Sequence, residues 1–199
     1  MRILVVGANG TVGQAVARAL SARHDIVTAG RSGGDITVDL MQAQSVSAMY
    51  QKLGTLDAVV ACAGHVHFGP VATMTPEQFR KGLDDKLMGQ VNLVLLGMAH
   101  VADGGSFTLT SGVLDRDPVR QGANAAAVNG AIGGFVKAAA IEMPRGIRIN
   151  AVSPGLLEES EKKYEGFFPG HEPVSSARVG LAYVKSVEGA LTGQVFAVG

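Results

Sequence analysis

The residues that decide the fold lie near the amino terminus, where Ile3–Gly13 reads ILVVGANGTVG. Four apolar residues in a row, followed at once by glycine, are typical of a strand that is buried on both faces of a parallel sheet. From Thr11 onward the apolar residues recur with a helical period and fall on one stripe. The stretch therefore predicts a strand, a sharp glycine turn and a helix, which together open an α/β sheet.

The rest of the chain repeats this alternation of short apolar runs and longer helical segments. The predicted strands are Ile3–Val6, Ile26–Ala29, Ile36–Val38, Ala58–Ala61, Ser106–Leu109, Ile147–Val152 and Gln194–Val198. The predicted helices are Thr11–Arg23, Ser45–Leu53, a helix from Pro76 that continues through Lys86–Val101, Asn124–Met143 and Val174–Val187. Since such alternation requires right-handed crossovers, we expect a single α/β domain over residues 1–199. It is a doubly wound (Rossmann) parallel sheet of about seven strands with helices on both faces.

Composition narrows the class of protein. The 199 residues fit one domain at about 100–200 residues per domain, and 47% hydrophobic against 17% charged residues excludes a disordered chain. Seventeen basic and seventeen acidic residues leave a net charge of +0, so we expect neither nucleic acid nor an anionic membrane as a partner. Cys62 is the only cysteine, and no run reaches 18 apolar residues. We therefore expect no disulfide, no metal site, no membrane span and a cytoplasmic location.

The glycine turn is a candidate phosphate-binding loop. Gly7 permits the sharp turn, Gly10 leaves room for a phosphate to approach the backbone, and Gly13 lets the helix pack on the strand. The helix N-terminus adds free N–H groups and partial positive charge. The alternative is a tight turn that binds no ligand. The other cofactor-binding candidates in this loop are Asn9, Thr11 and Val12.

The end of the second predicted strand indicates which dinucleotide is bound. An NAD site usually has an acidic residue there for the ribose 2′-hydroxyl, but Gly30 is followed by Arg31 and Ser32, with no acid before Asp35. Arg31 can pair with a 2′-phosphate and Ser32 can donate to it, so we expect NADP(H). The alternative is an ordinary surface arginine. We expect two further residues at the adenine, although the first can instead cap a turn: Asp39 and Leu40.

Three further motifs carry a family resemblance. The loop after the fourth predicted strand reads ACAG at Ala61–Gly64, the sixth strand and its turn read RINAVSPG at Arg148–Gly155, and the last strand begins TGQVF at Thr192–Phe196. With the glycine loop, these resemble the short-chain dehydrogenase/reductase family along nearly the whole chain. The resemblance implies that family's fold and a nicotinamide dinucleotide site. The residues that it adds to the cofactor site are Cys62, Ala63, Gly64, Pro154 and Gly155.

The catalytic residues of the family are missing at the matching positions. Family members use a Ser, a Tyr followed four residues later by a Lys, and an Asn on the preceding helix. The serine position falls on Gly112, with Ser111 one residue before it. The tyrosine and lysine positions hold Ala125 and Asn129, and the asparagine position holds Lys86. Because alanine cannot move a proton, the family's standard carbonyl reduction does not carry over residue by residue.

Three interpretations remain. In the first, a hydride still moves between NADP(H) and a small carbonyl or alcohol substrate, and another group handles the proton. The candidates are Lys86 and Ser111, and beyond them His65, His67 and Tyr164. Lys86 can replace the charge of the missing lysine. In the second, the protein binds NADP(H) without chemistry, as a sensor or a subunit. In the third, the scaffold catalyses an isomerisation or elimination.

The sequence also suggests a lid and a partner copy. Residues 156–173 follow the Pro-Gly turn in a short, charged segment, which we expect to form a mobile lid over a small or open substrate pocket. The helices Lys86–Val101 and Asn124–Met143 correspond to those through which family members pair, so we expect a homo-oligomer, a dimer or a tetramer. Helical glycines at Gly130, Gly133 and Gly134 favour close packing there.

Overall fold

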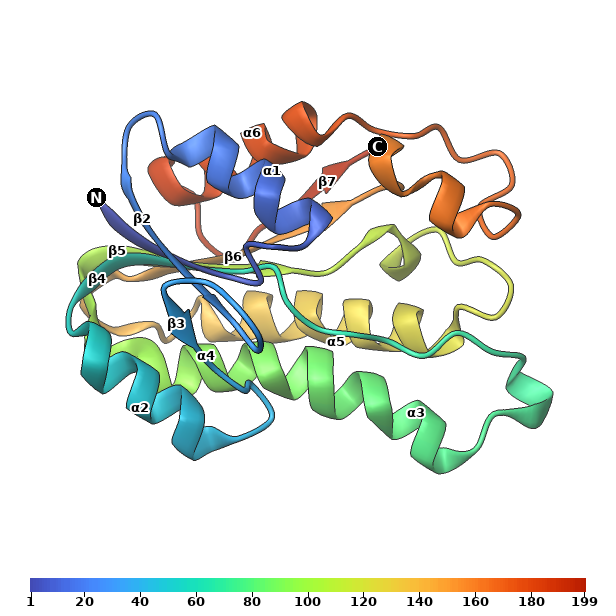
Figure 1. Ribbon diagram of the computed structural model, residues 1–199, viewed down its shortest axis with the longest axis horizontal. Coiled ribbons are helices and arrows are strands. Elements are labelled where there is room, and N and C mark those ends of the chain that lie inside the picture. Colours follow the sequence, from blue (N-terminus) through green and yellow to red (C-terminus); the bar gives the residue numbers. More distant parts are fainter.

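The computed structural model describes residues 1–199 and forms one seven-stranded parallel sheet in the order β3-β2-β1-β4-β5-β6-β7 (Figure 1). The chain starts in the middle of the sheet, builds outward to β3, and then crosses back over β1 to build the other half. The strands are β1 Arg2–Val6, β2 Asp25–Gly30, β3 Ile36–Thr37, β4 Leu56–Ala61, β5 Val101–Thr110, β6 Arg148–Pro154 and β7 Val195–Val198. The doubly wound fold predicted from the sequence is therefore confirmed.

Helices cover both faces of the sheet. α1 (Thr11–Leu20) and α6 (Ser176–Glu188) lie together on one face, whereas α2 (Ala43–Leu53), α4 (Gly89–Gly97) and α5 (Ala123–Ala139) lie on the other (Figure 1). α3 (Pro76–Gly82) runs into a π-helical turn at Leu83–Met88 and then into α4, so residues 76–97 form one continuous rod. Single 3-10 turns lie at Val71–Thr73, Met98–His100, Val113–Asp115, Pro144–Gly146, Glu158–Ser160 and Lys162–Tyr164.

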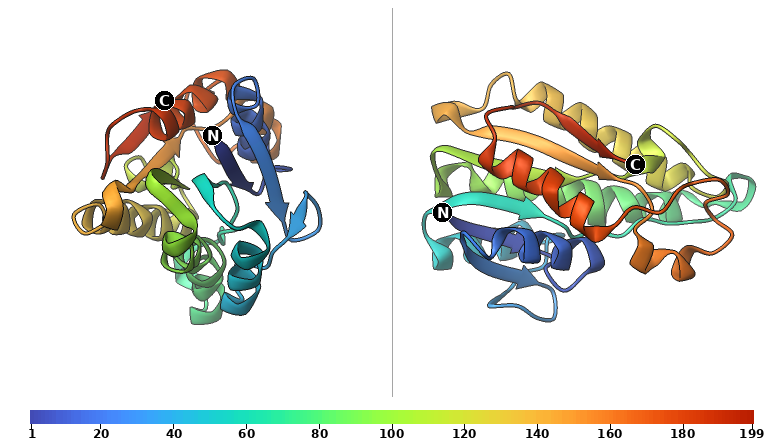
Figure 2. Two further views of the ribbon diagram at one scale, coloured as in Figure 1. Left: turned by 90° about the vertical axis from the view of Figure 1, so that its left-hand side faces the viewer. Right: turned by 90° about the horizontal axis from the view of Figure 1, so that it is seen from above.

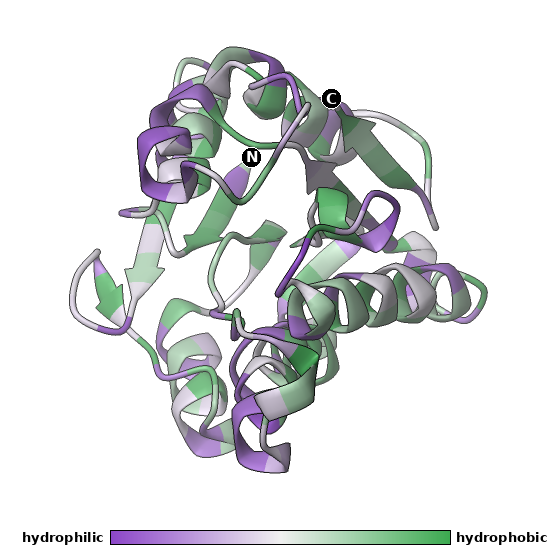
Figure 3. Cartoon of the chain, turned by 90° about the vertical axis from the view of Figure 1, so that its right-hand side faces the viewer, coloured by the Kyte–Doolittle hydropathy of each residue, from purple (hydrophilic) through white to green (hydrophobic).

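The strands are largely apolar along their length, while the helices alternate apolar and polar surfaces (Figure 3). Two separate cores follow, one on each face of the sheet, because β1 and β4 send alternate side chains to opposite sides. None of the helices is long and apolar enough to span a lipid bilayer.

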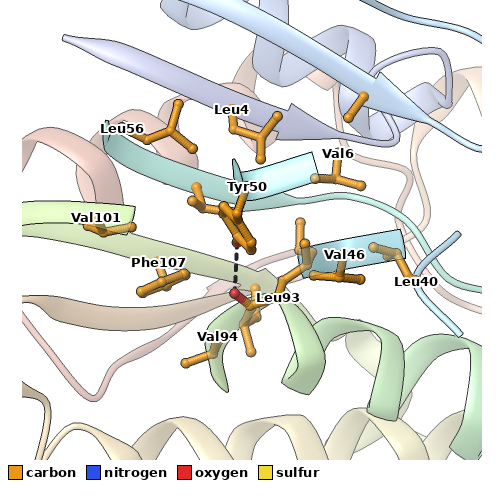
Figure 4. Close-up of a cluster of buried hydrophobic side chains, with 14 of the residues drawn as sticks. Leu4, Val6, Leu40, Val46, Tyr50, Leu56, Leu93, Val94, Val101 and Phe107 are labelled. Carbon is orange, nitrogen blue, oxygen red and sulfur yellow. Dashed lines mark hydrogen bonds between the residues drawn. The ribbon is translucent and has the colours of Figure 1, made fainter. Parts of the chain in front are cut away.

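Tyr50 lies at the centre of the larger core. Its ring is fully buried, and its hydroxyl donates a hydrogen bond of 2.7 Å to the carbonyl oxygen of Leu93 (Figure 4). Gly97 makes the arrangement possible, since a Cβ there would lie 2.4 Å from the Tyr50 hydroxyl oxygen. This hydrogen bond ties α2 to α4 beneath the sheet.

We expect Tyr50→Phe to lower the free energy of unfolding by about 1 kcal/mol, because the ring still fills the core but the Leu93 carbonyl loses a buried partner. Chemical denaturation of the variant and the wild type measures the difference. Equal midpoints with equal slopes would contradict this role for the hydroxyl.

Most element boundaries match the prediction to within two or three residues, and the differences have local causes. β5 begins at Val101 rather than Ser106, because Val101 already pairs with Leu56 of β4. The register shifts before the next pair, Ala58 with Ser106, and Gly104 within this irregular stretch has a φ of +73°. α5 ends at Ala139, before a chain of turns that leads to Pro144. α6 begins at Ser176, where the Ser175 hydroxyl accepts from the N–H of Arg178 as an N-cap.

The carboxyl ends of all strands lie at one end of the molecule, as parallel pairing requires. Two segments project beyond that end, the loop after β4 and residues 156–173 after β6, seen in teal and orange at the right of the second view (Figure 2). In open α/β sheets, ligands bind in the crevice outside the carboxyl ends of the strands. A binding site is therefore expected at this end of the molecule.

Candidate active site

Two adjoining cavities lie at the carboxyl ends of the strands. The first, of about 270 Å³, lies over β1, β2 and β4, and the second, of about 570 Å³, lies over β4, β5 and β6 beneath residues 156–173. Four residues border both cavities, so the two form one continuous groove. They are Gly10, Cys62, Gly64 and His65.

The glycine loop lies where the two cavities meet. Gly7 has a φ of +84°, and a Cβ there would lie 2.9 Å from the backbone of Cys62 and Ala63. A Cβ on Gly13 would lie 2.1 Å from the Gly7 carbonyl oxygen, so that glycine lets α1 pack on the loop. At Gly10 a Cβ would meet nothing closer than 3.4 Å, so the protein itself leaves that space open. α1 begins without a side-chain cap and without an acid in its first turn, which leaves its N–H groups free for an anion.

Arg31 stands at the end of β2 as an exposed guanidinium with no hydrogen-bond or ion-pair partner in the protein, and it lines the first cavity with Ser32. The nearest acid in the sequence, Asp35, is occupied elsewhere. Its carboxylate accepts from the N–H of Thr28 at 2.8 Å and from the Thr28 hydroxyl at 2.7 Å, and these hydrogen bonds lower the pKa of Asp35. This edge of the groove therefore presents a free cation.

The remaining predicted cofactor residues lie in the same groove. Asp39 and Leu40 line the first cavity, where the Asp39 carboxylate also accepts from the N–H of Met41 at 3.1 Å and so caps a turn. Of all the predicted cofactor residues, only Gly13 lines neither cavity. Those in the first cavity are Gly7, Asn9, Gly10, Arg31, Ser32, Asp39, Leu40, Cys62, Ala63 and Gly64, and those in the second add Thr11, Val12, Pro154 and Gly155.

Lys86 reaches the second cavity from the π-helical turn. Its ammonium donates hydrogen bonds of 2.7 Å to the carbonyl oxygen of Ser111 and of 2.7 Å to the Oδ1 of Asn129. Burial lowers the pKa of Lys86 to about 8, against a smaller opposing effect of the Asp115 carboxylate. π-turns of this kind are frequent at functional sites, because they displace a side chain from its regular helical position.

Ser111 holds Lys86 through its backbone. Its carbonyl accepts from Lys86, while its single hydroxyl hydrogen has two acceptors within reach, an Asp115 carboxylate oxygen at 3.3 Å and the carbonyl of Val152 at 3.4 Å. Asp115 in turn accepts from the Ser153 hydroxyl at 3.1 Å, and Arg116 donates to that same hydroxyl oxygen. This network of Asp115, Arg116 and Ser153 was missed from the sequence, because its members meet only when β5 and β6 lie side by side.

Ala125 is the residue that the family resemblance matches to the catalytic tyrosine, and apolar side chains occupy the space around it. Ala125 is only 2% exposed and packs with Val113 and Leu114 in a small apolar cluster that Phe68 and Phe168 also contact. One turn later, Asn129 donates to the carbonyl of Gly112 at 3.2 Å and accepts from Lys86. Lys86 and Asn129, at the positions that the family resemblance matches to an asparagine and a lysine, are therefore in direct contact.

The other candidates differ in their position. His65 and Tyr164 line the second cavity, and the Nδ1 of His65 lies 2.9 Å from an Asp85 carboxylate oxygen. His67 borders neither cavity of the groove, and its backbone N–H donates to the Oδ1 of Asn124 at 2.8 Å. Tyr164 belongs to a group of aromatic side chains that sequence patterns did not reveal.

Tyr183, from α6, lies close to the groove. Its hydroxyl is 2.6 Å from the Thr110 hydroxyl, directly behind Cys62, which lines both cavities. Burial raises the pKa of the Cys62 thiol to about 12, so the thiol stays protonated. Cys62 therefore lines the groove without acting as a nucleophile.

We expect Gly64→Ala to disturb Lys86 directly. Gly64 has a φ of +127°, and a Cβ there would lie 2.7 Å from the Cα, Cβ and Cγ of Lys86. Strain at this φ costs about 1–3 kcal/mol, so the melting temperature should fall. Gly166→Ala is the matched control, since Gly166 also has a positive φ (+79°) but has open space around its Cβ position. Equal losses in the two variants would mean that the contact with Lys86 has no effect of its own.

Known proteins resemble this chain in sequence and in structure. The family model described as enoyl-(acyl carrier protein) reductase matches residues 1–180. An uncharacterized oxidoreductase of Methylorubrum extorquens is 27% identical over 178 residues, which cover 77% of this chain and 72% of the relative. The crystal structure of the protein lin1944 from Listeria innocua is 50% identical and superimposes with a TM-score of 0.99, with both chains covered completely. A small-chain dehydrogenase in complex with NADPH is 28% identical, with a TM-score of 0.87 over 100% of this chain and 96% of the other.

Proposed function

This chain belongs to the short-chain dehydrogenase/reductase family, and from that premise we propose that it is an NADP(H)-dependent oxidoreductase of a small carbonyl or alcohol substrate, with Lys86 in place of the usual tyrosine as the group that handles the proton. The observation that carries the proposal is the position of Lys86. Its ammonium is held at the wall of the second cavity, at the carboxyl end of the sheet, by two acceptors.

The residues of the groove fit NADP(H). The free N–H groups of α1 and the open space at Gly10 suit the diphosphate, and the unpaired Arg31, with Ser32 beside it, suits the 2′-phosphate. Pro154 and Gly155 would border the nicotinamide in the second cavity. A relative of known structure that binds NADPH supports the choice of cofactor. When bound, the cofactor supplies or accepts the hydride.

Lys86 can deliver a proton to the substrate oxygen. An ammonium has three N–H donors, and two are occupied by Ser111 and Asn129, which leaves one for a carbonyl oxygen in the second cavity. With a pKa of about 8, the side chain exchanges its proton near neutral pH, as a general acid requires. The Asn129 amide oxygen and the Ser111 carbonyl orient the Lys86 nitrogen in both protonation states, because the neutral amine still has two N–H groups to donate.

The experiment combines binding and turnover. Calorimetry with NADPH and NADH measures affinity, and the absorbance of NADPH follows oxidation over a panel of aldehydes and ketones. Tight NADPH binding with turnover of at least one carbonyl compound supports the proposal. Absence of binding by either dinucleotide at saturating concentrations would overturn it.

The second candidate is a catalytically silent NADP(H)-binding protein that acts as a sensor or a subunit. Two observations favour it: Ala125 is buried among apolar side chains, and the Ser111 hydroxyl has its acceptors within the protein, at Asp115 or Val152. Tight NADPH binding without turnover of any compound in the panel would select this reading.

We also propose a homodimer through α4 and α5. Large apolar side chains are exposed in and beside these helices: Met88, just before α4, at 43%, Leu95 in α4 at 53%, and Ile141, just after α5, at 89%. The exposed Gly130 and Gly134 have open space at their Cβ positions, which lets a partner helix approach closely. Light scattering should give twice the mass of one chain, and a mass of about 20.5 kDa would refute the proposal.

A further inference from the structure

Aromatic side chains form part of the wall of the second cavity. Phe68, from the loop after β4, lies 6.1 Å from Tyr164 between ring centroids, and Tyr164 lies 5.8 Å from Phe168. All three rings line the cavity. Such tilted and edge-to-face arrangements expose ring faces and edges to whatever enters, and they favour a flat aromatic guest over a branched aliphatic one.

The lining of this cavity has positively charged side chains and no negatively charged ones. Its lining contains no Asp or Glu, whereas it contains Lys86 and Lys163. Lys163 is exposed, lies 5.3 Å above the Tyr164 ring and has no carboxylate within 4.0 Å. The acids of the same segment face elsewhere, since Glu161 and Glu165 line a neighbouring cavity together with Lys162. Of the charged side chains in residues 156–173, only that of Lys163 lines the second cavity, and none of the carboxylates does.

The two cations have different tasks. Lys86 is half-buried and donates to Ser111 and Asn129, and its remaining donor suits a carbonyl oxygen. Lys163 lies over the Tyr164 ring among the aromatic residues of the lining, as a compact point charge with no carboxylate partner. A single ammonium of this kind suits a monoanionic carboxylate, whereas a phosphate would call for several donors or a bidentate arginine.

From this arrangement we propose that the substrate is an aromatic aldehyde or ketone that carries a carboxylate. Its ring packs among Phe68, Tyr164 and Phe168, its carboxylate pairs with Lys163, and its carbonyl points to Lys86. The identity of the reaction rests on the proposed function: the carbonyl carbon accepts a hydride from NADPH, the oxygen accepts a proton from Lys86, and the products are the hydroxy acid and NADP⁺. Lys86 recovers its proton from solvent.

Matched pairs of compounds test the proposal. Phenylglyoxylate, 3-carboxybenzaldehyde and 4-carboxybenzaldehyde place the carboxylate at different distances from the carbonyl, and the methyl ester of each removes only the charge. Binding to the protein saturated with NADP⁺ is measured by calorimetry, and turnover is measured with NADPH. We expect at least one acid to bind about tenfold more tightly than its ester, as one charge-assisted contact allows.

Two lysine variants supply the control. Lys163→Gln should abolish the preference for acid over ester, while Lys162→Gln, one residue away and facing the neighbouring cavity, should keep it. Phe168→Leu should weaken acid and ester alike by removing a ring, and pyruvate, which lacks an aromatic ring, should bind more weakly than phenylglyoxylate in the wild type.

The outcomes separate the two proposals. Acid-selective binding that depends on Lys163 but gives no turnover would support the substrate pocket and overturn the oxidoreductase proposal. Turnover in which every ester matches its acid, or a preference that survives in Lys163→Gln, would overturn the substrate class and leave the oxidoreductase proposal standing.

Discussion

Lys86→Met is expected to lower kcat for NADPH-dependent carbonyl reduction by at least about 100-fold, the usual contribution of a general acid. Methionine has nearly the length of lysine but carries no proton. It also leaves the Ser111 carbonyl and the Asn129 amide oxygen without a donor, which costs about 1–3 kcal/mol of stability. Steady-state kinetics of the variant, together with its melting curve, measures both effects. Activity retained within a few-fold of wild type in a folded variant would remove Lys86 from the mechanism.

Two further measurements separate proton transfer from general damage. Lys137→Met, on the exposed surface of α5 and outside both cavities, should leave kcat unchanged. In the wild type, reduction needs the protonated amine, so the rate should be level below pH 8 and fall about tenfold per pH unit above the pKa of about 8. The oxidation of an alcohol needs the neutral amine and should rise up to pH 8 and then level off. A rate that stays flat from pH 7 to pH 9.5 in both directions would contradict the assignment.

Arg31→Ala is expected to weaken NADPH binding by about 10- to 100-fold and to leave NADH binding nearly unchanged. A charge-assisted contact contributes about 1–3 kcal/mol, and only NADPH has the 2′-phosphate that takes part in it. No competing acid lies at this position, since Asp35 is held by Thr28. Calorimetry with both dinucleotides gives the ratio directly.

Arg120→Ala is the control for this experiment. Arg120 is also an exposed arginine without a partner, but it lies outside both cavities, so its loss should leave both affinities unchanged. If Arg31→Ala weakened NADPH and NADH equally, Arg31 would be acting on a part that the two share, and the 2′-phosphate would need another partner.

Local patterns in the sequence were sufficient for much of the fold. The apolar run that ends at Gly7 predicted β1, and alternating segments predicted the parallel sheet, because strands buried on both faces are continuously apolar. Thr75 and Gln78 form a reciprocal capping box at the start of α3, as their spacing favours. The early start of β5 could not be predicted, since it depends on the pairing of Val101 with Leu56 of the neighbouring strand β4.

The same distinction between local patterns and long-range contacts applies to the candidate site. The glycine loop and Arg31 could be predicted to lie at the groove, because their positions depend on the residues next to them in the sequence. Lys86 could be placed beside Asn129 through the family pattern, but its hydrogen bonds, its π-turn and its lowered pKa depend on contacts between α3–α4, β5 and α5. The aromatic walls join Phe68 with residues almost a hundred positions later, and no local signal connects them.

The direct contact between Lys86 and Asn129 limits the order in which the two residues can be exchanged one at a time. Changing Asn129 to Lys first would place two ammonium groups within hydrogen-bonding distance in a partly dry site, where like charges repel strongly. Changing Lys86 to Asn first would leave two neutral amides that can bond to each other. A laboratory exchange of the pair should therefore begin at Lys86 and pass through the uncharged intermediate.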